Sequence, residues 1–162
     1  SNNLSWTLAI CLLLDTGVRL SELLDMRFKN VDFDHSMIQL QHTKNGEKRC
    51  VFYNSLSREL LIKAHKKKKE FIFWNYEKET RLNKRSLEHF FDKINCNLKP
   101  IERIHPHRLR KTFATKLLRK GCPLTTISKL LGHKDIRQTM IYLQIDQICL
   151  ENDYNNYYPY EK

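Results

Sequence analysis

The sequence contains little glycine and proline, with four residues of each among its 162. It also has no apolar run near the roughly 18 residues that a membrane span requires, because the longest run, 8–14, ends at Asp15. No secretory signal is visible. This composition excludes a collagen-like or low-complexity chain, and an apolar content of 41% is enough for a buried core. We therefore expect one compact, helix-rich domain that lies in the cytoplasm and does not bind a membrane.

The cysteines exclude two further classes of protein. They are odd in number and scattered, without a Cys-x-x-Cys pair: Cys11, Cys50, Cys96, Cys122 and Cys149. This pattern argues against a disulfide framework and against a zinc cluster of the usual spacing. His105 and His107 are separated by a proline, and no carboxylate or thiol is adjacent to complete a shell of about four ligands. We expect neither a metal ion nor a cofactor.

Acidic residues are too few to balance the basic ones, and the net charge is +11. Residues 1–142 contain 28 Lys and Arg against 14 Asp and Glu, which leaves +14, whereas residues 143–162 contain one against four, which leaves −3. The stretch HPHRLRKTFATKLLRKG, at 105–121, holds six Lys and Arg, two His and no acid. A body this basic repels itself, so a polyanion is its natural partner. We predict nucleic acid, although a lysine run such as 66–69 is also typical of a solvated helix face.

Apolar periodicity predicts helices along most of the chain. Their expected ranges are 4–14, 18–26, 57–69, 84–98, 106–121, 123–132 and 136–145. Gly17 breaks the chain after the first helix, Pro106 starts a later one, and Gly121 and Gly132 end two others.

A small antiparallel sheet is predicted within residues 31–53. Residues 37–41 alternate between apolar and polar, residues 48–53 are rich in strand-forming types, and Asn45-Gly46 between them is a strong hairpin signal. The segment FIFWN at 71–75 is either a short strand or a buried connection. The expected fold class is α+β, a mainly helical domain with a small antiparallel β-sheet insert.

Several cationic side chains occupy positions from which they can reach a common ligand. Arg19 stands at the start of a helix, and Glu22 lies three residues later, where it can pair with Arg19 and orient the guanidinium. His107 and Arg110 share one face of a helix. These four residues form the first half of a candidate site.

Three further residues complete it: Lys44 at the tip of the predicted hairpin, His133 just after a helix end, and Tyr142 on the next helix. Arginine forks bind phosphate oxygens, and preorganised donors stabilise the charge that develops in the transition state. A tyrosine can form a covalent intermediate, a lysine can protonate a leaving oxygen, and a histidine can transfer a proton near neutral pH. This set suits phosphoryl transfer with a tyrosine nucleophile and no metal.

Five motifs carry a resemblance to a known family: TGVRLSEL, TKNGEKR, HPHRLRKTFAT, LLGH and TMIYLQ. In this order they resemble the catalytic domain of tyrosine site-specific recombinases, the phage-integrase and Xer-like family, over about residues 8–145. The resemblance implies a catalytic domain at 1–145 and a tail at 146–162 that docks in cis or on a neighbouring protomer. Nothing resembles the N-terminal core-binding domain of the family, so we expect this chain to be a fragment of a longer recombinase.

By the same resemblance, six residues have catalytic roles: Arg19, Lys44, His107, Arg110, His133 and Tyr142. Tyr142 would attack the scissile phosphate of double-stranded DNA, giving a 3′-phosphotyrosine and a free 5′-hydroxyl. A 5′-hydroxyl from a second duplex would then exchange strands within a homotetramer, without metal or ATP. Four cations that follow His107 on the same helix are expected to contact the DNA backbone: Lys111, Lys116, Arg119 and Lys120.

Other interpretations remain open at this point. Residues 123–143 also fit a helix-turn-helix, which would make the protein a DNA-binding regulator without a reaction. An inactive integrase relative would look similar, and a topoisomerase would use the same side chains on one duplex. Lys48 shares the hairpin with Lys44 and is the alternative lysine.

Overall fold

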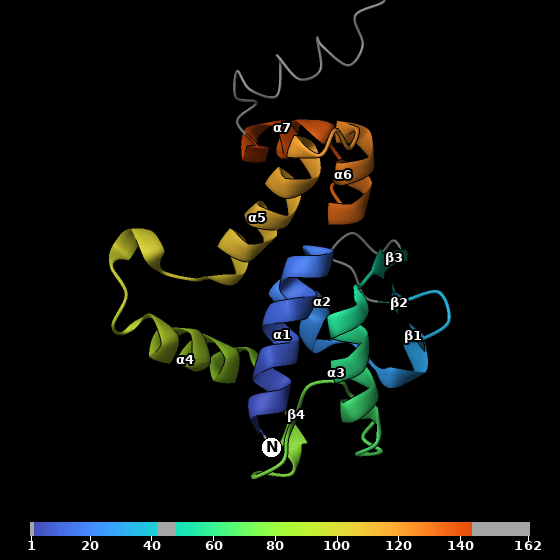
Figure 1. Ribbon diagram of the computed structural model, residues 1–162, viewed down its shortest axis with the longest axis vertical. Helices are drawn as coiled ribbons and strands as arrows, with labels where there is room; N and C mark the ends of the chain where they lie inside the picture. Colours follow the sequence, from blue (N-terminus) through green and yellow to red (C-terminus); the bar gives the residue numbers. More distant parts are fainter. Residues whose placement is uncertain (1, 42–47, 144–162) are drawn as a thin grey trace, which may run out of the picture.

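The computed structural model describes residues 2–41 and 48–143 as a mainly helical domain with small antiparallel sheets, which confirms the predicted fold class (Figure 1). The α-helices are α1 (Asn2–Thr16), α2 (Leu20–Leu24), α3 (Ser55–His65), α4 (Lys84–Asn95), α5 (Pro106–Arg119), α6 (Leu124–Leu131) and α7 (Ile136–Leu143). Two 3-10 turns lie between these elements: η1 (Phe28–Asn30) between α2 and the first strand, and η2 (Pro100–Glu102) between α4 and α5.

The predicted sheet has the strand order β1-β2-β3, with β1 (Val31–Asp32), β2 (Met37–Leu40) and β3 (Arg49–Phe52) antiparallel to their neighbours. Ile38 pairs with Val51, and both side chains are buried, so one face of the sheet packs on the core. The predicted pairing of the two hairpin strands is therefore confirmed. The Asn45-Gly46 turn itself lies outside the described residues.

The segment at 71–75 combines both predicted alternatives. Ile72 and Phe73 are buried, and the chain then forms β4 (Trp74–Asn75), which pairs with β5 (Thr80–Arg81). The second strand of this hairpin was not predicted, because its two residues are exposed and carry no alternation.

Several predicted helix ends differ from the observed ones by a few residues, and three of them have a visible local reason. The helix predicted at 18–26 begins only at Leu20, because Arg19 is extended and its N–H bonds the Glu22 carboxylate at 2.8 Å. The helix predicted at 57–69 ends at His65, and three residues later Lys68 takes a φ of 54°. The helix predicted at 84–98 ends at Asn95, whose side chain exchanges two 2.7 Å hydrogen bonds with the Ile104 backbone.

Helix α1 is the centre of the packing. Its residues Leu8, Leu12 and Leu13 are fully buried, and α1 contacts α2, α3, α5, β3 and β4. Trp6 of α1 is partly buried and stacks on Phe90 of α4, with ring centroids 4.7 Å apart. No helix within residues 2–41 and 48–143 has the length and apolar content to cross a membrane.

The hydrophobic core has two parts. The larger one surrounds α1, and the smaller one lies between α5 and α6, built on Ala114, Ile127 and Leu131. Figure 1 shows α5, α6 and α7 grouped at one end of the domain, beyond the ends of α1 and α3. Between the two parts of the core, α5 and α6 approach α2 and β3. Polar side chains of these elements come together there.

Candidate active site

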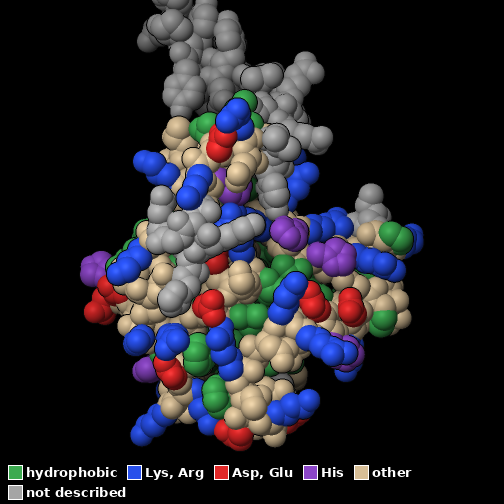
Figure 2. Space-filling model, turned by 180° about the vertical axis from the view of Figure 1, so that it is seen from behind, with side chains coloured by type: hydrophobic (Ala, Val, Ile, Leu, Met, Phe, Trp, Pro, Cys, Tyr) green, Lys and Arg blue, Asp and Glu red, His purple; other side chains and the backbone are tan. Residues whose placement is uncertain are grey.

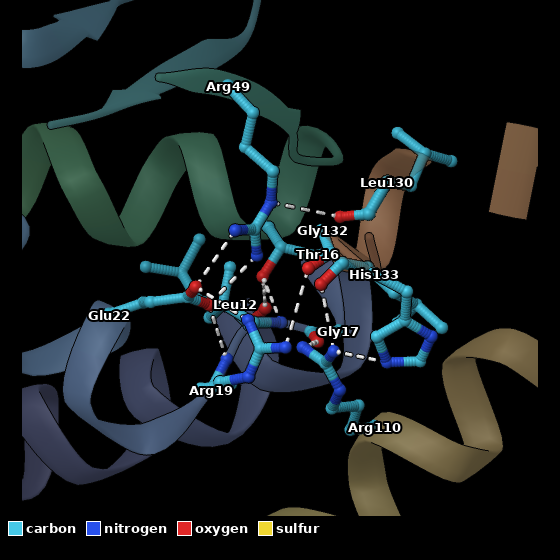
Figure 3. A network of polar contacts seen from close by, with 12 residues as sticks. Leu12, Thr16, Gly17, Arg19, Glu22, Arg49, Arg110, Leu130, Gly132 and His133 are labelled. Atoms are coloured by element: carbon cyan, nitrogen blue, oxygen red, sulfur yellow. Dashed lines mark hydrogen bonds and ion pairs between the residues drawn. The ribbon is translucent and has the colours of Figure 1, made fainter. Parts of the chain in front are cut away.

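Three arginines from separate elements converge at the carboxyl end of α6 (Figure 3). Arg19 is the residue before α2, Arg49 is the first residue of β3, and Arg110 lies in the second turn of α5. Arg110 is only 4% exposed, and the side chain of Arg49 is 12% exposed. Such burial of arginine requires nearby acceptors.

Those acceptors include three consecutive backbone carbonyls at the end of α6. Each arginine donates to a different one, at N–O distances of 3.2, 2.8 and 3.4 Å: Arg49 to Leu130, Arg110 to Leu131 and Arg19 to Gly132. The last carbonyls of a helix lack intrahelical partners and carry the negative end of the helix dipole. The end of α6 therefore gathers the three guanidinium groups.

A buried carboxylate provides the counter-charge. The side chain of Glu22 is 1% exposed; its two oxygens accept from Arg49 at 2.8 Å each and from the Arg19 backbone N–H and side chain at 2.8 and 3.1 Å. Burial alone would raise the pKa of Glu22, but the hydrogen bonds and charges of Arg49 and Arg19 hold that pKa below its ordinary value. Glu22 is therefore ionised, and it forms the ion pair with Arg19 that the sequence spacing predicts.

Arg110 also determines the state of His133. Its guanidinium donates to the Gly17 carbonyl at 2.6 Å and lies 3.0 Å from His133 Nε2. Arginine has no acceptor, so Nε2 must accept, and the imidazole proton must lie on Nδ1, which is 2.8 Å from Thr139 Oγ1. Burial and then the charges of Arg110, Arg19 and Arg49 lower the pKa of His133 to about 4, opposed by Glu22. His133 is neutral at pH 7.

Arg19, His107 and Arg110 line one cavity of about 670 Å³ between α2, α4 and α5. His107 is exposed, whereas Arg110, three residues later, is buried. The cavity also takes Glu88 and Asp92 from α4. The structure thus brings three of the six predicted catalytic residues to one opening and connects a fourth, His133, to it through Arg110.

The remaining two predicted catalytic residues are less fully described. Tyr142 lies in α7, one turn beyond Thr139, whose hydroxyl contacts His133; the side chain of Tyr142 is outside what the structure describes. Helix α7 packs against α5 and α6, and its Thr139 is connected to Arg110 through His133. Lys44 lies outside the described residues, five positions before Arg49.

The four predicted DNA-backbone cations are all exposed on or at the end of α5: Lys111, Lys116, Arg119 and Lys120. Figure 2 shows Lys and Arg side chains spread over the coloured part of one face, with fewer acidic ones between them. The charge excess is therefore a broad surface property, distinct from the buried arginine cluster.

Two members of the site were not predicted, Arg49 and Thr139. Arg49 belongs to the motif TKNGEKR, but nothing local in the sequence connects it with Glu22, 27 residues earlier. Thr139 belongs to TMIYLQ and is fully buried. A polar residue at a buried helix position, three residues before the predicted nucleophile, was the available signal.

The donor types in this site suit anions rather than metal ions. Within residues 2–41 and 48–143, no three His, Cys, Asp or Glu side chains lie close enough together to hold a metal. Guanidinium groups are suited to phosphate oxygens.

Known proteins resemble this chain in sequence. A model of the phage integrase family matches residues 1–147. Tyrosine recombinase XerA of Saccharolobus solfataricus is 41% identical over 148 residues, which are 91% of this chain and 48% of that relative. A probable integrase/recombinase of Acholeplasma phage L2 is 31% identical over 159 residues, 96% of this chain and 54% of that relative. The chain thus spans about half the length of these relatives.

Solved structures share the fold. The crystal structure of XerA recombinase matches with a TM-score of 0.77 at 23% identity, over 97% of this chain and 64% of that one. A structure of XerH site-specific recombinase bound to difH substrate matches with a TM-score of 0.75 at 24% identity, over 98% of this chain and 48% of that one. The family model covers nearly the whole sequence and the fold agrees with it, so this chain belongs to the phage integrase family.

Proposed function

We propose that this chain is the catalytic domain of a site-specific DNA recombinase that cleaves and rejoins strands through a 3′-phosphotyrosine, without metal or ATP. The observation that carries the proposal is the convergence of Arg19, His107 and Arg110 at one cavity, with His133 in contact with Arg110. The domain would comprise residues 1–145, with 146–162 as a docking tail. The activity of the whole protein is part of the proposal, because the chain spans about half of its relatives.

In this mechanism Arg19 and Arg110 bind the non-bridging oxygens of the scissile phosphate. Both guanidiniums now donate to backbone carbonyls of the α6 end, and the Arg19 contact with Gly132 is long, at 3.4 Å. A phosphate dianion-like transition state is a stronger acceptor than a peptide carbonyl, so it can take over these donors. Loss of one such donor typically costs about 10²–10³-fold in rate.

The proton transfers are assigned to the remaining residues. Tyr142 attacks phosphorus and loses its proton, while the 5′-oxygen leaves and gains one from Lys44. His133 is neutral and lies next to Arg110, so its Nε2 can accept the proton of Tyr142 once Arg110 turns to the DNA. His107 is the exposed donor at the cavity mouth.

Double-stranded DNA is the proposed partner, bound by a homotetramer on two synapsed sites. The neighbour described as XerH recombinase bound to difH substrate, in a pre-cleavage complex, supports DNA as the ligand. A helix-turn-helix regulator is not favoured, because it would give no role to the buried cluster of Arg19, Arg49 and Arg110.

A nicked duplex tests the reaction directly. When the short strand beyond the cleavage site diffuses away, any covalent intermediate is trapped. Candidate sites flanking the gene or its element are incubated with the protein in EDTA, and the products are separated in SDS. We expect a protein–DNA adduct with the natural sequence and with Tyr76→Phe, and none with Tyr142→Phe.

An adduct formed by Tyr142→Phe would show that Tyr142 is not the nucleophile. Binding without an adduct calls for the same experiment with any coding sequence that precedes these residues in the gene, and continued absence there would leave a module that only binds. Joining of strands from two duplexes, rather than resealing of one, separates a recombinase from a topoisomerase.

A further inference from the structure

Arg49 makes three hydrogen bonds within the site and has no role in the proposed chemistry. Its Nη1 and Nη2 donate to the two oxygens of Glu22 at 2.8 Å each, and its Nε donates to the Leu130 carbonyl at 3.2 Å. All three sides of the guanidinium are thus engaged with the protein. Its side chain is 12% exposed, against 24% for Arg19. Arg49 does not line the cavity that takes Arg19, His107 and Arg110.

Glu22 binds two cations, and both of its carboxylate oxygens bond to each of them. Each of its oxygens accepts one bond from Arg49 and one from Arg19, the latter from the backbone N–H and from Nη1. A carboxylate has about four lone-pair sites, so all of them are used. The side chain that orients Arg19 is therefore itself fixed by Arg49.

The charges of this group do not cancel. Two guanidiniums and one carboxylate leave a net charge of +1. If Glu22 had Arg19 as its only partner, the pair would be neutral and Arg19 would have little attraction left for an anion. Arg49 supplies the counterion of Glu22, so Arg19 can be held by Glu22 and still present its positive charge.

We propose that Arg49 is a positioning residue. It serves as the counterion of Glu22 and binds the end of α6 through the Leu130 carbonyl. Glu22 can then orient Arg19 without neutralising it. The same contacts join β3, which follows the Lys44 hairpin, to the α6 end that precedes His133. This inference rests on the proposed function for its effect on cleavage, but the geometry of the group can be tested without DNA.

The charge argument predicts a rescue that a merely structural arginine would not produce. Arg49→Gln leaves Glu22 paired with Arg19 alone, and we expect DNA cleavage to slow by about 10- to 100-fold, as for other residues that support a functional group. Adding Glu22→Gln removes the unbalanced carboxylate and restores the net charge of +1. We expect the double variant to cleave about tenfold faster than Arg49→Gln alone, a coupling within the usual range for contacting residues.

Two further variants complete the cleavage test. Arg49→Lys keeps the charge but loses the fork, so it should cleave faster than Arg49→Gln and more slowly than the natural sequence. Arg58→Gln is the matched control, because Arg58 also donates to a backbone carbonyl, that of Phe33 at 3.2 Å, away from the cavity. Its cleavage rate should not change.

A second readout needs no DNA. In the folded protein the charges of Arg110, Arg19 and Arg49 lower the pKa of His133, and Glu22 raises it. An NMR titration of the His133 imidazole should therefore give a higher pKa in Arg49→Gln, and a lower one again when Glu22→Gln is added. Arg49→Lys should remain near the natural value.

The outcomes separate the two proposals. Cleavage by Arg49→Gln at the natural rate, or a double variant slower than Arg49→Gln, would overturn the positioning role. A natural chain that forms no adduct overturns the proposed function, and the titration then decides alone: an unchanged His133 pKa in Arg49→Gln would show that Arg49 does not belong to the group. An upward shift that Glu22→Gln reverses supports the assignment.

Discussion

At the scale of single residues, His133 has the clearest measurable property. Its pKa is lowered to about 4 by burial and by the neighbouring charges, whereas an unfolded chain has a histidine pKa near its ordinary 6.5. Between these values the unfolded chain binds a proton that the folded protein does not. The free energy of unfolding should therefore fall as the pH drops from about 6.5 towards 4, by at most about 1.4 kcal/mol per pH unit.

Urea unfolding at pH 7, 6 and 5 checks this expectation by comparing the natural sequence with His133→Gln. The variant should lose less stability on acidification. His35, whose pKa is raised by its hydrogen bond and ion pair with Asp32, contributes in the opposite direction, but equally in both proteins. Equal pH slopes for the two proteins would mean that burial and the arginines do not hold His133 neutral.

At the scale of elements, the end of α6 depends on Gly132. This residue has a φ of 67°, and a Cβ at its position would lie 2.5 Å from Nη1 of Arg49. Gly121, after α5, has a φ of 78° but no atom within 4 Å of such a Cβ. Both alanine variants should cost about 1–2 kcal/mol for the left-handed backbone, and Gly132→Ala should cost more because Arg49 must also move.

Asparagine separates the two terms, because it tolerates the left-handed region. Thermal or urea unfolding should find Gly121→Asn close to the natural stability and Gly132→Asn still destabilised. If Gly132→Asn were as stable as Gly121→Asn, the close approach of Arg49 to the α6 end would be contradicted.

At the scale of the whole molecule, the excess of cations predicts DNA binding that weakens steeply with salt. Each phosphate contact contributes about 0.9 to the slope of log K against log[salt]. Changing Lys116, Arg119 and Lys120 to glutamine together should lower the slope by roughly 2–3 if all three contact phosphates. The measurement is a titration of duplex DNA at several salt concentrations.

The control is a triple glutamine variant at Lys66, Lys67 and Lys68, three exposed lysines after α3. Replacing them removes the same amount of charge. A smaller change of slope is expected there. Equal slopes for both triple variants would show that overall charge, rather than the α5 surface, determines the affinity.

The Arg19–Glu22 ion pair could be predicted from the sequence, whereas the long-range contacts of Arg49 and Arg110 could not. Glu22 lies three residues after Arg19, and one helical turn brings them together, so their ion pair was predictable. Arg49 bonds Glu22 across 27 residues, and Arg110 bonds the Gly17 carbonyl across 93. Contacts at such separations leave no periodicity in the sequence, and the motifs predicted Arg110 but gave Arg49 no role.

By itself the sequence determined the helices, the hairpin strands, the basic character and the family, because helix periodicity, caps, glycine stops and short motifs act over a few residues. Only the tertiary structure decided that three arginines meet at the last carbonyls of α6, that Glu22 is shared between two of them, and that His133 is neutral. The physical reason is that burial and long-range hydrogen bonding set these charges, and both exist only after α1, α5, α6 and β3 have packed together.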